Sequence, residues 1–563
     1  MDGALAQLAA RGHRVHVAAN LTDGDGGPAA VERLAAATPG ITFGWAPSRP
    51  DNAWSQLTMS VRQGLDYLRY LKPEYDATPA LRRRVLDRTP RLFLAIGEHW
   101  LGRNRLSRWA LGRALTAVER EMPRCPEVNA YIREHDPDVV MITPLIGLGT
   151  SEYDYLISAR ALGYPTAFPV FSWDNLSSKS LVRHVPDSVI VWNDTQRQEA
   201  IALHHIPRSR VAVTGAHCFD RWFEARPSRS RAAFCERAGL PADRPILLWV
   251  CSGMFAVFKD SPKEADLVRR WVTQVRGSAD PRLREAAILV RPHPRRFDEW
   301  QGIDLKEFPH VALWGANPID QETRADYFDA LYHSNAVVGL NTSAFLEAAI
   351  AGRPVFTILR PEFYEKQEGT IHFAYLLEAG GGLLHTSRDF DEHLVQLSSA
   401  LADPERASAK SRAFVSEFIR PFGLDQPGTP KFVEAVERTA ALGRRPERRP
   451  AWWWPIASRL LARLVSGLEE PKWQRLLLSP KQLEEVEHQR AKRDEWAARR
   501  AATLEQRTRE REAAVARREA EREARRLERD EQIRAKRREK DEARRRAAAS
   551  RSEEPPPPGG GTP

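Results

Sequence analysis

The chain has 563 residues, of which 42% are hydrophobic and 28% are charged, and its formal net charge is +10. This length exceeds what one hydrophobic core supports, so we expect two or three domains with additional segments. Roughly half of the net positive charge lies beyond residue 480, so the basic balance is largely a property of the C-terminal end.

Cysteine usage and hydropathy restrict the cellular setting. The four cysteines, Cys125, Cys218, Cys235 and Cys251, show neither CxxC spacing nor dense pairing, which is typical of a reducing cytoplasm and argues against a structural zinc site. We find no secretory signal pattern and no apolar run long enough to span a bilayer. We therefore expect a cytoplasmic protein, either soluble or peripherally attached to the inner face of the cell membrane.

The N-terminus predicts a helix that ends at Gly12 and a strand from Arg14 to Ala19. A parallel sheet normally begins with a strand and a Gly-rich turn, so we expect that the true start lies upstream and that the first strand is missing. N-terminal sequencing of the native protein tests this expectation. Residues 51–134 carry helical patterning with little strand character, which predicts an inserted helical section.

The first domain is predicted to span residues 1–220. Short apolar strands alternate with helices at 154–162 and 195–204, which indicates a parallel sheet covered on both faces. The predicted strands after the insertion are 138–143, 166–171, 188–193 and 210–214. A polar stretch rich in Arg, Ser and Pro, residues 221–244, is interpreted as the linker to a second domain.

The second domain is predicted to span residues 245–442 and repeats the alternation of strand and helix. Two doubly wound domains place a cleft between the carboxyl ends of their strands, where open α/β sheets bind ligands. The predicted strands are 246–251, 287–291, 311–314, 336–340, 354–359 and 382–385.

The composition changes after residue 442. Residues 443–480 combine a Trp cluster with basic and apolar positions, which suits either a helix on a membrane surface, through 451–478, or a helix packed over the domains. Residues 481–551 are mostly Arg, Glu, Ala and Lys with opposite charges three and four apart, which predicts a solvated single helix rather than a coiled-coil seam. The tail, 552–563, is predicted to be disordered.

Residues 336–358, AVVGLNTSAFLEAAIAGRPVFTI, predict a strand, a polar turn, a helix and a second strand. Asn341, Thr342 and Ser343 have short polar side chains that suit the cap of a helix beginning near Ala344. A helix N-terminus attracts phosphate, and Glu347 lies one turn further on, within reach of a ribose hydroxyl. The alternative is an ordinary capped helix between two core strands.

A second motif, Arg291-Pro292-His293-Pro294, directly follows a predicted strand. The two prolines fix a turn, so that a guanidinium and an imidazole are presented together over the cleft. Arginine suits bidentate phosphate binding, and histidine can donate to a phosphate oxygen or act as a general acid. The alternative is a structural turn with a surface arginine.

Other polar residues follow predicted strands. Ser252 and Gly253 follow the first strand of the second domain and would contact a diphosphate through backbone N–H groups. Asp174, after the strand that ends at Phe171, is a candidate base for an acceptor hydroxyl, although an Asp-Asn pair there also suits a turn or helix cap. Further cleft candidates are Glu368, Thr370 and His372.

Several function classes are excluded by missing motifs. The chain has no Gly-x-Gly-x-x-Gly sequence and no Walker loop, which argues against dehydrogenases and P-loop enzymes. No His and Cys cluster has metal-ligand spacing, so we expect no metal and no cofactor apart from the substrate's own nucleotide. The acidic residues of the C-terminal tail nearly balance its basic ones, so binding to nucleic acid is not expected.

The combination of these motifs resembles the GT-B superfamily of nucleotide-sugar enzymes over roughly residues 1–440. The sequence VPDSVIVWNDTQRQEAIALHHIPRSRVAVTGAHCFD is similar to the end of a GT-B N-terminal domain, and VVGLNTSAFLEAAIAGRPV resembles the GT-B donor-binding unit. Arg-Pro-His-Pro resembles the His-Pro motif of CDP-glycerol glycerophosphotransferases, bacterial sialyltransferases and Kdo transferases.

The resemblance implies roles for particular residues. Thr342 and Ser343 would contact the donor diphosphate, Glu347 the ribose, and His293 the donor phosphate. GT-B enzymes typically work without a bound metal. The absence of the expected first strand and Gly-rich turn leaves the catalytic base unassigned by the resemblance.

The leading hypothesis is a GT-B glycosyltransferase or glycerophosphotransferase that moves a sugar or polyol phosphate from a nucleotide-sugar or CDP-polyol donor to a glycan or lipid-linked acceptor in cell-surface polysaccharide biosynthesis. The first domain would hold the acceptor and the second the donor. RPEFYEKQEGT also resembles elements of UDP-N-acetylglucosamine 2-epimerases, so an epimerase is an alternative. A non-catalytic GT-B scaffold is another alternative.

Overall fold

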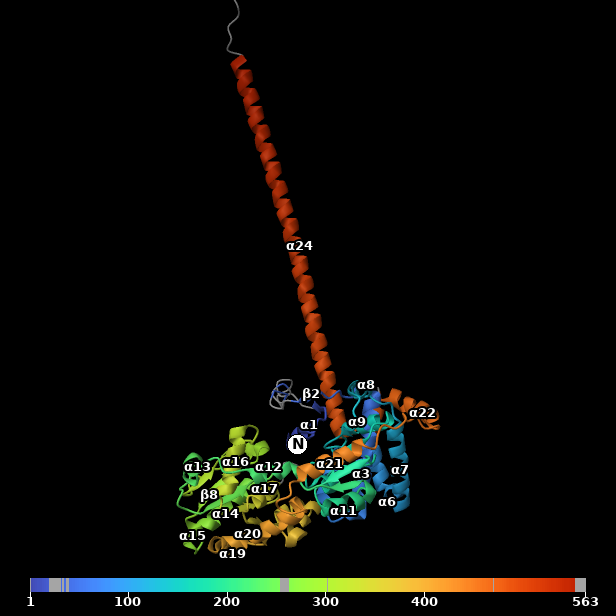
Figure 1. The fold of residues 1–563 in the computed structure, drawn as a ribbon. Coiled ribbons are helices and arrows are strands. Elements are labelled where there is room, and N and C mark those ends of the chain that lie inside the picture. The colour runs from blue at the N-terminus through green and yellow to red at the C-terminus, as the bar shows by residue number, and fades with distance from the viewer. Residues whose placement is uncertain are drawn as a thin grey trace, which may run out of the picture. The chain divides into compact units, whose positions relative to one another are not determined.

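The computed structural model describes residues 2–19, 32, 35–36, 40–253, 263–300, 302–468 and 470–551. The chain divides into two compact units, Met1–Leu483 and Glu484–Pro563, of which the first contains both α/β domains (Figure 1). The tail predicted to be disordered, 552–563, lies outside the described residues.

The first domain contains two parallel sheets among the described residues. After α1 (Asp2–Ala10), β1 (Val15–Ala19) pairs with β2 (Ile41–Trp45). The other sheet has four strands in chain order: β3 (Val140–Met141), β4 (Thr166–Pro169), β5 (Ser188–Val191) and β6 (Val211–Val213). Helices α9 (Glu152–Ala161) and α11 (Asp194–Ala202) alternate with these strands, as the sequence predicts. A strand upstream of α1 stays a prediction.

Residues 51–134, predicted to be an inserted helical section, contain helices and turns but no strand. α3 begins after Asn52, whose side chain accepts a hydrogen bond from Ser55 N, and nearly all of its residues beyond Gln56 are buried. The other helices therefore pack around α3 as a layer of their own. The elements are α3 (Ala53–Tyr70), η2 (Pro73–Tyr75), α4 (Pro79–Leu86), α5 (Arg91–Glu98), α6 (Trp100–Arg103), α7 (Arg105–Glu121) and α8 (Pro126–His135).

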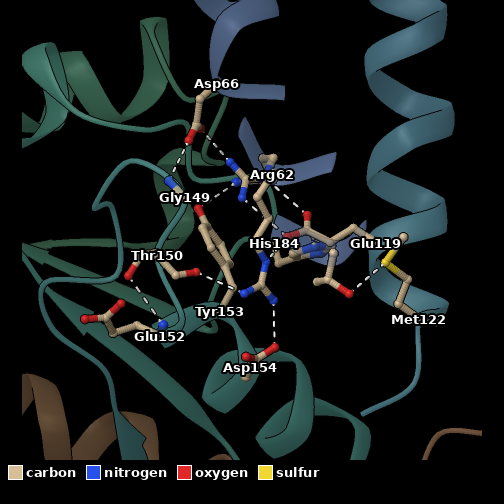
Figure 2. Close-up of polar contacts among 12 residues, drawn as sticks. Arg62, Asp66, Glu119, Met122, Gly149, Thr150, Glu152, Tyr153, Asp154 and His184 are labelled. Carbon is tan, nitrogen blue, oxygen red and sulfur yellow. Dashed lines mark hydrogen bonds and ion pairs between the residues drawn. The ribbon is translucent and has the colours of Figure 1, made fainter. Parts of the chain in front are cut away.

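Buried ion pairs join this helical layer to the first domain (Figure 2). Arg62 on α3 donates to Glu119 on α7 at 2.9 Å and to Asp154 on α9 at 2.7 Å. Arg183 donates to Asp66 at 2.8 Å and to Glu119 at 3.1 Å. All five side chains are at most 4% exposed. Because buried charges are costly without partners, this pairing fixes how α3, α7 and α9 pack together.

The second domain is one six-stranded parallel sheet in the order β12-β11-β10-β7-β8-β9. Counted from β7 this is 6-5-4-1-2-3, the Rossmann order seen from its other edge. Alternate residues of β7 enter separate cores, since Leu247 and Trp249 lie in one cluster and Leu248 in another. The strands are β7 (Ile246–Val250), β8 (Ala287–Arg291), β9 (Val311–Leu313), β10 (Ala336–Gly339), β11 (Val355–Ile358) and β12 (Leu384–Ser387).

Helices cover both faces of this sheet, as the doubly wound prediction requires. The principal elements are α14 (Glu264–Arg276), α16 (Gln321–His333), α17 (Ala344–Ile350), η7 (Pro361–Lys366), α18 (Ile371–Glu378), α19 (Phe390–Ala402) and α20 (Pro404–Phe414). The predicted last strand was placed too early, at 382–385, because Gly380, Gly381 and Gly382 all have positive φ and form a turn before Leu384.

Two chain crossings connect the domains. The outward crossing runs through η4 (His217–Phe219) and α12 (Asp220–Glu224), and the return runs from η9 (Val415–Ile419) to α21 (Gly428–Ala440), which packs against α1 and β5. Trp173 and Trp192 of the first domain belong to the same apolar cluster as Phe345 and Phe373 of the second. The two domains therefore share a continuous core below the cleft.

The C-terminal segments are helical. α22 (Trp454–Gly467) packs against α3 and α23 (Pro471–Leu477) against α5. The long charged helix is confirmed as α24 (Pro480–Arg551), in which Arg499 pairs with Glu495 and Arg509 with Glu505, each at 2.6 Å and four residues apart. Among the described residues, no helix is both long and apolar enough to cross a membrane. The predicted fold class, two Rossmann-like domains followed by a long charged helix, is confirmed.

We predict that Glu119→Gln strongly destabilises the first domain. Although burial acts in the opposite direction, Arg183, His184 and Arg62 hold the pKa of Glu119 well below its usual value. Removing the charge leaves buried guanidinium groups without their shared partner, a loss of about 3–5 kcal/mol at neutral pH. Thermal melting at pH 7 should therefore show a clearly lower Tm than for wild type.

The sign of the pH dependence provides a second readout. Because the folded pKa is depressed, the stabilisation by Glu119 is present above the unfolded pKa and is lost as pH falls through the folded value. The difference in Tm between wild type and Glu119→Gln should thus shrink in acid. Glu98→Gln, at an exposed position of α5, is the control and should melt like wild type. Equal Tm values for Glu119→Gln and wild type at pH 7 would contradict the assignment.

Candidate active site

A cavity of about 730 Å³ lies between the two domains. Its second-domain wall is built at the carboxyl ends of β7 and β8 and by the N-terminal part of α17, next to the switch point between β7 and β10 where such sheets bind ligands. The first domain contributes Ala80, Leu81, Arg84, Asp174 and Lys179; the second contributes Val250, Cys251, Gly253, Arg291, Pro292, His293, Pro294, Asn317, Pro318, Tyr327, Ala344, Glu347, Glu365, Lys366 and Thr370.

Arg291 is the last residue of β8 and is only 6% exposed. Its Nη2 donates to the carbonyl oxygen of Ala316 at 2.7 Å, and its guanidinium lies 4.7 Å from the centre of the Tyr327 ring. Nη1 has no hydrogen-bond partner among the described residues. Gly315 has a φ of +128°, which favours glycine, and a Cβ there would lie 2.2 Å from Nη1, so a larger residue would displace the guanidinium. A buried cation with an unused donor makes this wall of the cavity suited to an anion.

His293 lies two residues beyond β8, between the prolines that the sequence analysis singled out. It packs directly against Gly253, where a Cβ would lie 2.6 Å from the imidazole Nε2. Gly253 therefore has to be glycine for His293 to occupy this position. The structure thus brings together the two strand-end motifs, at β7 and β8, that were predicted to contact donor phosphates.

Glu347 lies on α17 and accepts a short hydrogen bond from the hydroxyl of Tyr327 on α16. Burial raises the pKa of Glu347 to about 7, against the opposing effects of Tyr327 and Arg291. Both residues line the cavity beside Arg291. A carboxyl group held in this way can accept hydrogen bonds from a ligand hydroxyl, as predicted for ribose.

The polar turn before α17 differs from its predicted role as a cap. Ser343 occupies the N-cap position, but its side chain makes no capping hydrogen bond. Thr342 Oγ1 accepts a long bond, 3.4 Å, from Ala344 N. The amide of Asn341 points elsewhere and donates to the carbonyl oxygen of Lys366 at 2.6 Å. Asn341 therefore holds the C-terminal end of η7 instead of capping α17.

Asp174 is the only acidic residue that the first domain contributes to the wall of the cavity within the described chain. Its carboxylate accepts from Ser172 at 2.7 Å and from Ser178 at 3.1 Å, and Lys179 Nζ lies 3.9 Å away. Burial alone would raise its pKa, but His372, Lys179 and the serine hydroxyls lower the pKa below its ordinary value. Asp174 is therefore ionised at neutral pH. Asp174 occupies the N-cap position of α10 (Asn175–Ser178), in line with the alternative considered from sequence, but its side chain makes no capping hydrogen bond.

The remaining candidate residues do not line the cavity, with the exception of Thr370. Ser252 is buried, and its N–H donates to Glu264 at 2.8 Å. His372 is fully buried with its ring edge-on to Trp173 at 4.9 Å, and burial lowers its pKa to about 4. Glu368 is exposed and pairs with Arg388 at 3.3 Å. Their predicted roles stay predictions.

Sequence reasoning missed several residues of the site. Tyr327 and Arg84 lie on helices far from the motifs, and no local pattern marks them. Lys366 lies within RPEFYEKQEGT and lines the cavity, where burial lowers its pKa to about 8. Glu264 accepts from Ser252 N and from Trp249 Nε1 at 3.0 Å, and burial raises its pKa to about 7. These two hydrogen bonds to Glu264 hold the turn after β7 in place.

No group of three or more His, Cys, Asp or Glu side chains is arranged to hold a metal ion in the described parts of the chain. The prediction that the reaction needs no metal stays a prediction.

No known protein family matches the chain by sequence profile, and no curated protein matches it. A putative UDP-N-acetylglucosamine 2-epimerase from Listeria monocytogenes aligns at 16% identity and a TM-score of 0.40, covering 60% of this chain and 82% of that one. WaaG, a glycosyltransferase involved in lipopolysaccharide biosynthesis, aligns at 13% identity and a TM-score of 0.38, covering 77% of this chain and 94% of WaaG. The wall teichoic acid polymerase TagF aligns at 10% identity and a TM-score of 0.33, covering 56% of this chain and 85% of the TagF chain. Likeness at this level carries no information about the reaction.

The raised pKa of Glu347 predicts how its substitution changes stability with pH. A folded pKa of about 7, above the unfolded value, means that the ionised group destabilises the fold and that this penalty grows as pH rises to about 7. Glu347→Gln should therefore gain Tm relative to wild type between pH 5 and pH 8, measured by thermal melting. Glu236→Gln, exposed on α13 (Arg231–Ala238), should show a pH-independent difference. A difference in Tm for Glu347→Gln that does not change with pH would contradict the raised pKa of Glu347.

Proposed function

We propose that the protein is a cytoplasmic GT-B transferase that moves a glycosyl or polyol-phosphate group from a nucleotide-activated donor to a glycan or lipid-linked acceptor in cell-surface polysaccharide biosynthesis. The observation that carries this proposal is the cavity itself. Its second-domain wall presents Arg291 and His293 together, and its first-domain wall presents the ionised Asp174. A cation and an imidazole opposite a carboxylate suit transfer between an anionic donor and a hydroxyl acceptor.

In this proposal the second domain holds the donor. Arg291 and His293 contact the phosphates, and Lys366 supplies a further cation in the same wall. Positive groups that neutralise charge developing on the departing nucleotide lower the barrier most where water is scarce, and Arg291 is nearly fully buried. We propose that these side chains do this without a bound metal. The polar turn at Thr342 and Ser343 and the backbone at Ser252 and Gly253 lie beside the same strand ends.

Glu347 is proposed to bind the ribose. Tyr327, whose ring lies 4.7 Å from the Arg291 guanidinium, donates a hydrogen bond from its hydroxyl to the Glu347 carboxyl group. The Tyr327 hydrogen bond limits the number of positions the carboxyl group can take, so less ordering is needed when the ligand binds.

The first domain is proposed to hold the acceptor. Asp174 would orient the acceptor hydroxyl by accepting a hydrogen bond from it, and would then accept its proton. Because its pKa lies below the ordinary value, Asp174 is a weak base, and orienting the hydroxyl is the larger part of its proposed role. Arg84 and Lys179 line the same side and would favour an acceptor that carries negative charge. Contact of 451–478 with the membrane would bring a lipid-linked acceptor near.

We predict that a thermal-shift panel of CDP, CMP, UDP and GDP identifies a stabilising nucleoside diphosphate. Arg291→Gln should weaken its binding by about 10- to 100-fold, since hydrogen bonds to charged groups contribute about 1.5–3 kcal/mol. Arg269→Gln, an exposed arginine paired with Glu307, is the matched control and should bind like wild type. A protein stabilised by none of these nucleotides would favour the non-catalytic scaffold.

Incubation with UDP-N-acetylglucosamine and no acceptor separates transfer from epimerisation. A transferase of this kind should yield no 2-epimer, as measured by chromatography of the nucleotide sugar, because the proposal provides no route to a new configuration at C2. Accumulation of the 2-epimer that disappears in His293→Ala would overturn the transferase proposal in favour of the epimerase. The fold of His293→Ala is checked by its Tm.

A further inference from the structure

The outer face of α7 is both apolar and basic. Leu106 and Trp109 are 77% and 64% exposed, and with Arg113 they occupy positions i, i+3 and i+7 on one side of the helix. Trp100, on α6, is 63% exposed. The sequence contains no Asp or Glu between Glu98 and Glu119, while it contains four arginines there, of which all but Arg108 are exposed. Exposed tryptophan and leucine among arginines are typical of surfaces that enter a lipid interface.

A second segment repeats this pattern far along the chain. Trp452, Ile456 and Leu460 are 87%, 65% and 58% exposed and recur every four residues across the start of α22. Arg459 and Arg463 are exposed next to them. No acidic residue occurs from Arg448 to Leu468. In α22, no side chain is fully buried, so the helix lies on the surface with only one side against the protein.

The two segments belong to the same helical layer of the first domain. Both α7 and α22 pack against α3, and α5 contacts both α6 and α23. Figure 1 shows α6, α7 and α22 on one side of that domain. Comparably exposed apolar residues of the second domain, Ile319 at 70% and Val395 at 67%, lie on separate elements, before α16 and on α19. Single exposed apolar side chains of that kind are normal on protein surfaces, whereas groups of exposed apolar side chains mark interaction sites.

We propose that α6, α7 and α22 together form one surface that binds an anionic lipid bilayer. The chemistry of the partner follows from charge. The surface carries exposed arginines, no acidic residue lies between Glu98 and Glu119 or from Arg448 to Leu468, and Glu119 and Glu121 at the end of α7 are buried, so the surface is complementary to negatively charged headgroups. Tryptophan at the rim of an apolar stripe suits the boundary between headgroups and acyl chains. This deepens the proposed function, because it adds α6 and α7 to the predicted contact of 451–478 and places the acceptor-side domain against the membrane.

Vesicle sedimentation with the full-length protein tests the proposal without a donor or an acceptor, so its failure is distinct from failure of the proposed transfer reaction. Vesicles of phosphatidylcholine with about one third phosphatidylglycerol should bind wild type, and binding should fall at high salt. Leu106→Ser/Trp109→Ser and Ile456→Ser/Leu460→Ser should each lower the apparent affinity about tenfold by removing two inserting side chains.

The controls isolate this surface from the charged C-terminal helix, which every variant retains. Ile319→Ser/Val395→Ser should bind vesicles like wild type, and Arg459→Glu/Arg463→Glu should lose the preference for anionic over neutral vesicles. Melting temperatures establish that each variant is folded; if a serine pair does not fold, the arginine pair and the salt dependence decide. Wild type that does not sediment with anionic vesicles would overturn the proposal. So would loss of binding with only one serine pair, or an equal loss with the second-domain control.

Discussion

The cavity depends on Asp220, whose carboxylate joins the two segments by which the chain crosses between its domains. Its oxygens accept hydrogen bonds from Arg420 at 3.1 Å, from Gly428 N at 3.0 Å, and from the N–H and hydroxyl of Thr429 at 2.8 and 2.6 Å. A carboxylate with several donors is a strong, directional junction. Because the outward and return crossings share it, the spacing of the two domains, and thus the width of the cavity, is set at this point.

The apolar interface below the cleft strengthens this junction. Trp173 stacks edge-on against His372 across the domains, and the Tyr375 hydroxyl donates to Glu199 of α11 at 2.7 Å. Burial raises the pKa of Glu199 to about 8, so this carboxyl is largely protonated at neutral pH. Keeping it neutral avoids placing a charge in the shared core. These contacts therefore hold the two domains together; His372 was also a cleft candidate in the sequence, and that role stays a prediction.

The buried arginines Arg62 and Arg183 of the first domain are fully paired, whereas Arg291 of the second is incompletely paired among the described residues. Where the helical insertion packs on the rest of the first domain, Arg62 and Arg183 are matched by carboxylates on several helices, which makes a rigid unit. In the cavity wall, Arg291 keeps an unused donor and is accompanied by Tyr327 and a carboxyl group with a pKa of about 7. A fully satisfied cluster supports the fold, whereas an incompletely satisfied one leaves binding capacity for a ligand.

Local sequence patterns predicted the strands, the two-domain division of the sheets and the motifs at their ends, because these depend on hydrophobic periodicity and on turn residues. Arg291, His293, Gly253, Glu347, Asp174 and Thr370 do meet at one cavity. The failures concern side-chain direction: Asn341 follows a strand as predicted, yet its amide satisfies the carbonyl of Lys366. Tyr327 and Arg84 could not be predicted as site residues, because their positions depend on how α16 and α4 pack, which no local sequence pattern encodes.

The central claim is that the cavity between the domains binds a nucleoside diphosphate through its second-domain wall. Determining the structure of the protein with the nucleotide that most raises its Tm tests this claim directly. The account predicts phosphate oxygens within hydrogen-bond distance of the Arg291 guanidinium and the His293 imidazole, with the ribose next to Glu347. A nucleotide bound outside the cavity, or bound in it with Arg291 and His293 making no contact to phosphate, would contradict the account.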